Sequence, residues 1–302
     1  MRFLVQKDYN RLISDADLNT VFNDTTTGQT YTIQQRIIDT EPAAQEEICS
    51  FIKQRFDISL IFTDTPVYSG AATYYGNSRV QYHEAPFSAA TIYTINQRIS
   101  YLGSIYFSIA GSAAHAFNPS EWTFICLDYQ LFYGILPAPT FQYFTKYSIG
   151  TVVWNPYDNR TYTSRVNNNW YALSDTTKWT QNAVYSFTAE LPTNGTYWIQ
   201  GDNRNPMLVQ KMVDIVLYHG LANITNRFEP EVRIRRYKGE AKENYVLSND
   251  NSALGWLTKI CDGKLNATLP DLPPKQEELS LRWHNQNGDN NTNWIDTPKM
   301  TY

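Results

Sequence analysis

Near the start of the chain, apolar residues recur at the three- and four-residue spacing of amphipathic helices. The pattern predicts one helix over residues 8–18. It predicts a second over residues 43–56, with Thr40 as the cap residue and Pro42 as an early proline. Each helix carries an apolar stripe on one face, so neither is expected to stand alone.

The same helical pattern returns after residue 205. A helix is predicted from Pro206 to a stop at Gly220, a shorter one after Pro230, and a last one over residues 252–262. Each end of the chain leaves an apolar stripe that only the other can cover, so we expect both ends to build one domain. The side chains expected to meet at its centre are Ile48, Phe51, Ile52, Leu208, Met212, Val216, Leu257 and Ile260.

The middle of the chain has a different pattern. Short runs rich in Tyr, Val, Ile, Phe and Thr are separated by Gly, Asn, Asp and Pro, which is typical of strands and turns. Charge divides the chain in the same way: residues 1–60 and 207–265 together hold 31 charged side chains, whereas residues 61–206 hold 15. We therefore expect a large all-β domain inserted into a small helical one.

The predicted fold class is α+β, with a discontinuous helical domain, a β insertion and an extended C-terminal arm. The expected boundaries are 1–60 and 207–265 for the helical domain, 61–206 for the insertion, and 266–302 for the arm. The arm is rich in Pro and Asn and too sparse in apolar residues to form a core of its own. Its large anchors suit binding to a partner or folding back onto its own domain: Leu279, Leu281, Trp283 and Trp294.

A degenerate repeat runs through the predicted insertion. In its first copy Tyr101 precedes a glycine, an apolar strand and Trp122; in its second Tyr147 precedes a glycine, Trp154, Tyr162 and Trp179. The order resembles small β modules of the chitin-binding type, and implies two modules at about 66–140 and 141–206. These aromatic residues either stack on sugar rings or close the module cores, and we favour the core for both repeat tryptophans.

No motif for catalysis, metal binding or nucleotide binding is present. The four histidines lie apart, and Cys49, Cys126 and Cys261 form no Cys-x-x-Cys pair. Asp128, Asp158, Asp175 and Glu190 define no carboxylate pair by spacing, and turn or cap roles are commoner for such residues. We expect no enzyme activity, no cofactor and no metal.

The overall charge and hydropathy exclude further classes of protein. A formal net charge of −4 disfavours a protein that mainly grips phosphate backbones. The basic run of Arg233, Arg235, Arg236, Tyr237 and Lys238 is bracketed by glutamates, which indicates a solvated or subunit-pairing helix face. No run of apolar residues approaches a membrane span, and we expect folding in a cytoplasm without a membrane partner.

The two helical blocks resemble the head-to-tail connector proteins of tailed bacteriophages, also called adaptor or head-completion proteins. In the first block the resemblance lies in the segments LVQKDYNRLISDADL and AAQEEICSFIKQRFD. In the second block it lies in MVDIVLYHGL, VRIRRYKGEA and ALGWLTKICDGKL. About 120 residues are covered, in the family's order. The chain departs from the family in its β insertion and in extra residues at 243–251, and a large connector of this kind suits a podovirus-like neck of the crAss-like type.

The resemblance implies a structural virion protein that forms a ring, expected to be a dodecamer, below the portal. Its implied partners are copies of itself, the portal, an adjacent tail or neck protein, and passing double-stranded DNA without specific binding. Its implied place is the virion neck, after synthesis in the bacterial host cytoplasm. The expected ring or portal contacts are the four arm anchors and four residues of the basic run: Arg233, Arg235, Arg236 and Tyr237. The alternative is a carbohydrate-binding host-attachment or decoration protein that acts through the β insertion.

Overall fold

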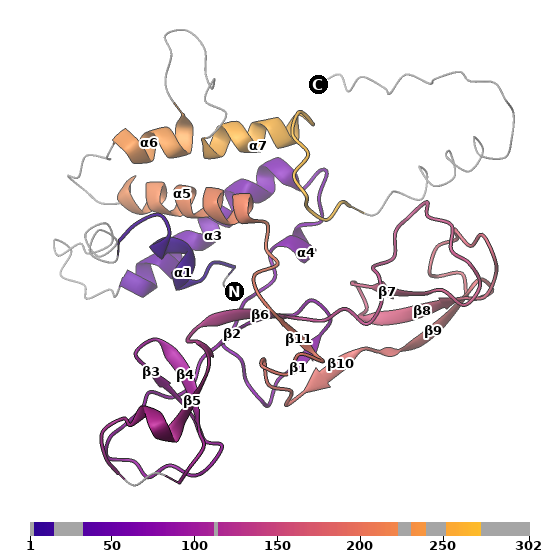
Figure 1. Ribbon diagram of the computed structural model, residues 1–302. Coiled ribbons are helices and arrows are strands. Elements are labelled where there is room, and N and C mark those ends of the chain that lie inside the picture. The colour runs from indigo at the N-terminus through magenta and orange to yellow at the C-terminus, as the bar shows by residue number, and fades with distance from the viewer. Residues whose placement is uncertain (1–2, 15–32, 112–113, 223–230, 240–251, 273–302) are drawn as a thin grey trace, which may run out of the picture.

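The computed structural model describes residues 3–14, 33–111, 114–222, 231–239 and 252–272. Helices from the two ends of the chain gather in one part of the molecule, and short antiparallel strands from the middle form the other (Figure 1). The predicted α+β class with a β insertion is therefore confirmed.

The helical domain contains six helices in the described ranges. They are α1 (Gln6–Asn10), α3 (Ile33–Ile52), α4 (Ile58–Ile61), α5 (Pro206–Ala222), α6 (Glu231–Lys238) and α7 (Ala253–Cys261). The apolar helix α5 packs against α3, α6 and α7, and all of them share one core. The eight side chains predicted to join the two chain ends all pack in this core, so that prediction is confirmed.

Two of the predicted helix starts are capped by a side chain. The Asn205 side-chain oxygen accepts a hydrogen bond from the Leu208 amide at 3.0 Å, and the Ser252 hydroxyl accepts one from the Gly255 amide at 3.0 Å. The α5 helix runs two residues beyond the stop predicted at Gly220, to Ala222. The short helix predicted after Pro230 is α6.

The predicted start of the second helix at Pro42 is wrong. Pro42 lies inside α3, which begins at Ile33. A proline inside a helix removes one backbone hydrogen bond, so the turn around it needs support from elsewhere. The neighbouring Glu41 is buried and accepts a 2.8 Å hydrogen bond from the Tyr9 hydroxyl, which ties this turn to the first helix.

The first helix is shorter than predicted, and the arm begins later than predicted. The α1 helix ends at Asn10, and residues 15–18 of the expected helix lie outside the described residues. Ala267 is buried in the helical core, and residues 270–272 pair with residues 55–57 through the Asp57 amide to the Pro270 carbonyl and the Leu272 amide to the Arg55 carbonyl. Residues 267–272 therefore belong to the helical domain rather than to the arm, because they fold against that domain.

In the described part of the β insertion there are eleven short strands and one 3-10 turn. They are β1 (Thr73–Tyr75), β2 (Arg79–Tyr82), β3 (Arg98–Tyr101), β4 (Ser104–Ser108), η1 (Pro119–Glu121), β5 (Trp122–Leu127), β6 (Gln130–Gly134), β7 (Val152–Asn155), β8 (Arg160–Ser164), β9 (Trp179–Val184), β10 (Ser186–Thr188) and β11 (Trp198–Gln200). Three sheets have three strands each, in the orders β2-β6-β11, β3-β4-β5 and β7-β8-β9, and β1 pairs with β10.

The three larger sheets belong to three copies of one structural unit. In each copy a tyrosine hydroxyl hydrogen-bonds both the amide and the carbonyl of the residue five positions earlier; these tyrosines are Tyr74, Tyr93 and Tyr147. Three residues after each tyrosine the backbone is left-handed, at Asn77, Asn96 and Gly150. Two residues further on, the first strand of each three-stranded sheet begins.

A tryptophan at the start of the third strand closes each unit. Trp198, Trp122 and Trp179 pack against the tyrosines of their own units, with ring centroids 5.0, 5.2 and 5.6 Å apart. Four residues before each tryptophan, an Asn or Asp side chain accepts a hydrogen bond from the backbone amide two positions on. The same contacts at the same spacing establish an internal threefold repeat.

The three units are nested. We call the unit with β1, β2, β6, β10 and β11 the central module, residues 85–127 the first inserted module, and residues 139–184 the second inserted module. The first inserted module interrupts the β2–β6 hairpin of the central module, and the second interrupts its β6–β11 hairpin. The central sheet takes strands from both sides of residue 140 in the sequence. The expected division into two modules at that residue is therefore replaced by three modules, and the central one is discontinuous.

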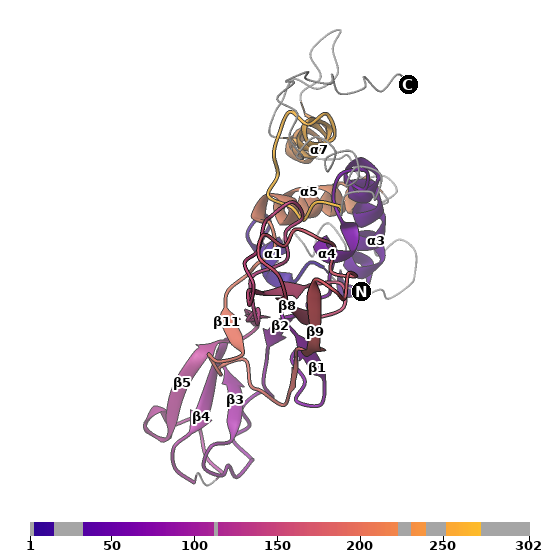
Figure 2. The ribbon, with the colours of Figure 1, turned by 90° about the vertical axis from the view of Figure 1, so that its right-hand side faces the viewer.

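The register of the sequence repeat also changes. The sequence repeat aligns Tyr101 with Tyr147. In the structure, Tyr93 is the residue whose hydroxyl makes the same backbone contacts as that of Tyr147. Tyr101 instead ends the first strand of its module, before the turn at Gly103. The first inserted module lies at the end of the molecule furthest from the helices in both views (Figures 1 and 2).

Candidate functional site

The helical domain and the β insertion meet at a buried charged cluster centred on Arg204, which lies between β11 and α5. Its guanidinium donates to both Asp8 carboxylate oxygens at 2.8 and 3.0 Å, to the Asp202 carboxylate at 2.7 and 2.9 Å, and to the Phe3 carbonyl at 2.7 Å. Burial alone would lower the pKa of Arg204, but the hydrogen bonds and charges of Asp202 and Asp8 raise it. The cluster ties the N-terminal segment to the exit of the β insertion.

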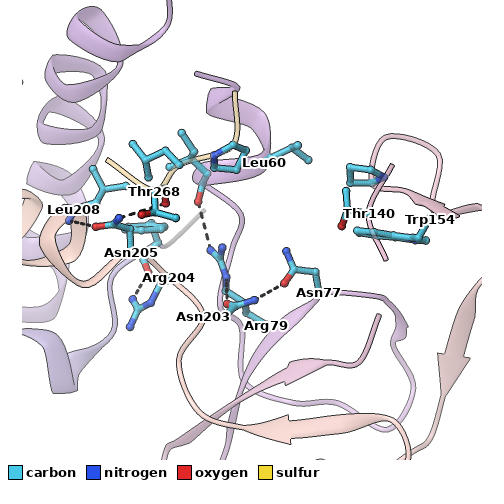
Figure 3. Close-up of a pocket in the computed structure, with 15 residues that line it drawn as sticks. Leu60, Asn77, Arg79, Thr140, Trp154, Asn203, Arg204, Asn205, Leu208 and Thr268 are labelled. Carbon is cyan, nitrogen blue, oxygen red and sulfur yellow. Dashed lines mark hydrogen bonds between the residues drawn. The ribbon is translucent and has the colours of Figure 1, made fainter. Parts of the chain in front are cut away.

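Arg79, at the start of β2, lies beside this cluster. Its Nε atom donates to the Asn203 side-chain oxygen at 2.6 Å (Figure 3). Its Nη1 atom lies 3.4 Å from the Ile61 carbonyl and 3.5 Å from the Thr63 carbonyl. Burial, and then the positive charge of Arg204, lower the pKa of Arg79 to about 10. This half-buried cation therefore joins the central module to the end of α4 and the segment after it through neutral oxygens.

A cavity of about 200 Å³ lies against these two arginines. Its wall includes Leu60 of the helical domain, Trp154 of the second inserted module and Thr268 of the segment after α7 (Figure 3). The lining places no nucleophile beside a general base, and the described residues contain no group of three or more His, Cys, Asp or Glu side chains that could hold a metal ion. The arrangement fixes the position of one part of the molecule relative to the other.

The predicted basic interface on α6 is mostly engaged within the chain. Tyr237 is buried, donates from its hydroxyl to Glu47 at 2.6 Å, and stacks on Tyr218 at 4.1 Å. Arg233 is half-buried, and its Nη2 atom lies 3.5 Å from the Leu12 carbonyl. Tyr237 is therefore a core residue rather than a surface contact, because its ring completes the α5–α6 interface.

The other two arginines of α6 remain accessible. Arg235 is 52% exposed and pairs with Glu231 one turn earlier at 2.6 Å. Arg236 is 40% exposed, and its Nη1 atom lies 3.7 Å from the Asp214 carboxylate. Burial raises the pKa of Asp214 to about 6, although Arg236, Lys211 and Arg233 each lower it. The sequence placed the four interface candidates on one helix, but the structure leaves only these two for a partner.

The aromatic residues considered for sugar stacking lie mainly inside the modules. Trp122, Trp154, Tyr162 and Trp179 are buried, and Tyr101 and Tyr147 are half-buried in aromatic clusters. Trp154 packs over Gly76 of the central module, where an added Cβ atom would lie 3.4 Å from the indole ring. These six residues therefore build module cores and module contacts.

A different aromatic pair is open to solvent. Trp170 and Tyr171, in the loop between β8 and β9, stack with their ring centroids 4.8 Å apart, and the Lys178 ammonium lies 5.1 Å from the Tyr171 ring. Tyr171 is 37% exposed, Trp170 is half-buried, and the Tyr171 carbonyl accepts from the Trp179 indole N–H at 2.9 Å. Our sequence reasoning missed this pair, although an adjacent Trp-Tyr beside an asparagine run was a visible signal.

The candidate catalytic carboxylates all serve turns or local hydrogen bonds. Asp158 and Asp175 each accept from the backbone amide two residues on, and Glu190 accepts from Asn194 at 2.9 Å. Asp128 bridges His83 and the Ser100 hydroxyl, at 2.9 and 2.5 Å. In a Ser-His-Asp triad the histidine lies between the serine and the carboxylate and acts as the base. Here the carboxylate lies between the other two, so the serine hydroxyl has no imidazole beside it to act as its base.

The four arm anchors, Leu279, Leu281, Trp283 and Trp294, lie outside the described residues. Comparison with known proteins finds no family model and no curated protein that matches the chain. Across the ranges that the structure describes, none of the helices has both the length and the apolar character needed to traverse a bilayer.

Proposed function

We infer that the protein is a structural subunit of a phage neck, where it forms a ring, a dodecamer, below the portal. The observation that carries this proposal is the discontinuous helical domain, in which the two connector-like blocks share one core although 145 residues separate Phe62 from Leu208. In a domain closed in this way, helices form the outer surface and the β insertion projects from one side. Such a subunit can pair with copies of itself around a closed ring.

The proposed partners follow from this role. The ring binds the portal on one side and a tail or neck protein on the other, and double-stranded DNA passes through its lumen. The net charge of −4 suits a channel that does not hold DNA, since DNA affinity comes largely from phosphate contacts with Lys and Arg. The proposed location is therefore the virion neck, after synthesis in the bacterial host.

Electron microscopy of the full chain, alone and mixed with the portal of the same virus, tests this proposal. We expect closed rings whose subunit number equals that of the portal, with the β insertions projecting from the ring body. Mass photometry of the same samples gives the copy number independently. A chain that stays monomeric in both samples, or a copy number unlike the portal's in intact necks, would falsify the proposal.

A second candidate, sugar binding by the second inserted module, is favoured by one observation. The Trp170–Tyr171 pair offers stacked rings beside Lys178 and a run of asparagines, and aromatic faces of this kind stack on sugar rings. A pull-down of the full chain on host polysaccharide should lose the protein on Trp170→Ala and keep it on Phe124→Ala, which removes a 53% exposed ring from the other inserted module. Equal retention of both variants, or no retention of the parent, would exclude sugar binding at this pair.

A further inference from the structure

A groove of about 490 Å³ runs between the second inserted module and the helical domain. Four aromatic side chains of that module line one side: Phe141, Tyr143, Phe144 and Tyr157. Leu60 and residues 269–272 line the other side. Phe144 is 36% exposed, Tyr157 49% and Leu272 41%, so the groove presents apolar surface to solvent.

Both sides of the groove present backbone groups that have no hydrogen-bond partner among the described residues. Asp271 forms a bridge to Phe56 through hydrogen bonds made by its two neighbours, so its own N–H and C=O point to the opposite side. Thr140 is placed in the same way against Trp154, since residues 139 and 141 make the hydrogen bonds of that bridge. Asp271 and Thr140 both line the groove. An extended peptide could therefore pair with either edge, as in strand addition.

The sequence of the arm contains a segment that suits such a groove. Residues 278–283 read ELSLRW, in which Leu279, Leu281 and Trp283 alternate with polar residues. Alternation of this kind places the three apolar side chains on one face of an extended strand. Aromatic and aliphatic anchors on one face, with main-chain hydrogen bonds along the edge, are the two features that strand addition uses.

The linker before this segment disfavours a return to the groove of its own chain. Residues 273–277 read PPKQE, with two prolines and no Gly, Asn or Asp to form a tight reversal. An extended path of five residues spans roughly 15 Å at about 3 Å per residue. From this composition we expect the segment to extend away from residue 272 and to reach a neighbouring subunit rather than the groove of its own chain.

We propose that the groove of each subunit binds residues 278–283 of a neighbouring copy as an added strand, with Trp283 among the aromatic side chains. The proposal rests on the proposed ring, and it makes the ring contact head-to-tail, because each copy gives its arm to the next and receives one from the previous. The partner of the arm is thus a second copy of this chain rather than the portal.

Disulfide trapping between two tagged copies of the full chain tests this pairing. Cys49 and the exposed Cys261 are first replaced by Ser, while the buried Cys126 stays. One copy then carries Gln142→Cys at the groove, and the other carries Arg282→Cys on the polar side of the arm segment. We expect a cross-linked product that contains both tags. A matched pair with Thr123→Cys, at an exposed position of the first inserted module, should give little product.

The outcomes separate this inference from the proposed ring. A link that forms only when both cysteines are on one chain shows that the arm folds back, and overturns the inference. Closed rings without a cross-link between copies also overturn it, because the ring then uses other contacts. A cross-link between copies without closed rings supports the arm–groove contact and counts against the ring.

A substitution series gives a second measure that needs no cysteine. Trp283→Ala should weaken self-association of the full chain by about tenfold or more, as for other buried interface tryptophans, while Arg282→Ala has little effect. The melting temperature of the dilute monomer should not change in either variant. An unchanged association constant for Trp283→Ala, or a large loss of monomer stability, would contradict the proposal.

Discussion

The helical domain and the β insertion reach stability by different routes. Among the described residues, the helical domain has one mostly aliphatic core of 23 buried residues, drawn from both ends of the chain. The two inserted modules have three buried hydrophobic or aromatic residues each at their centres, supported by partly buried aromatic rings and by a tyrosine bonded to the backbone. Damage to the first kind of core should therefore spread through the whole domain, and damage to the second should stay within one module.

The largest expected effect comes from the cluster that joins the two regions. Replacing Arg204 by Met leaves the buried Asp8 carboxylate without its partner, and should lower the free energy of unfolding by about 3–5 kcal/mol. Urea denaturation measures the loss. The control is Arg235→Met, which removes only an exposed pair with Glu231 and should cost less than about 1 kcal/mol. Equal losses in both variants would show that the cluster does not join the two regions.

A truncation inside a module should be as severe, but local. Trp179→Ala removes the ring that closes the second inserted module, and should cost about 3–5 kcal/mol within that module. Hydrogen exchange should quicken at residues 139–184 and stay slow in α5 and in the first inserted module. Faster exchange throughout the helical domain would contradict the view that the modules have separate cores.

The matching change in the helical domain should spread across the chain. Ile52→Ala truncates a fully buried side chain of α3, and should cost about 2–5 kcal/mol. Amide exchange should quicken in α3, α5 and α7 together, although α3 and α7 lie some 200 residues apart in the sequence. Leu102→Ala, at an 86% exposed position, is the control. If Ile52→Ala melts like the parent, the two chain ends do not form one domain.

The smallest expected effect is a dependence of helical stability on pH. The folded-state pKa of Asp214, about 6, lies above the ordinary value near 4, so the folded state binds a proton more tightly than the unfolded state. The stability contributed by this proton is fully present below about pH 4 and is lost as the pH rises to about 6.

Chemical denaturation at a series of pH values measures this dependence. Asp214→Asn should remove that part of the slope, and should raise the free energy of unfolding at pH 7 by at most about 3 kcal/mol, because the buried Lys211 loses its counter-charge in the same variant. Lys211 and Arg236 face the same carboxylate, so the same series should be run on Arg236→Gln. An Asn variant that is less stable than the parent at pH 7 would show that the charged carboxylate is stabilising.

The helical part was the more predictable of the two regions, because its periodicity and caps are local signals. Asn205 and Ser252 begin α5 and α7 where the sequence indicates. The start at Pro42 was misjudged because a tertiary contact, Tyr9 to Glu41, supports the helix around the proline. Local propensity gives no information about that contact.

In the β insertion the strands could be predicted, but their nesting could not. The central module is divided into three pieces by the two inserted modules, so its repeat is not continuous in the sequence. A usable signal was present, since an aromatic residue lies six positions before each of Tyr74, Tyr93 and Tyr147. The Arg204 cluster had no such signal, because Asp8 and Arg204 are 196 residues apart in the sequence.

The nested order of the modules also fixes the sequence in which the chain can complete its structure during synthesis. The first inserted module is complete once Leu127 has been made, and the second once Val184 has been made. The central module must wait for β11, and the helical domain, although it begins first, must wait for α7. Each finished module then shortens the open loop that its parent must close, which lowers the entropic cost of the next closure. During synthesis the inserted modules can therefore fold first and the central module after them, and the helical domain forms last.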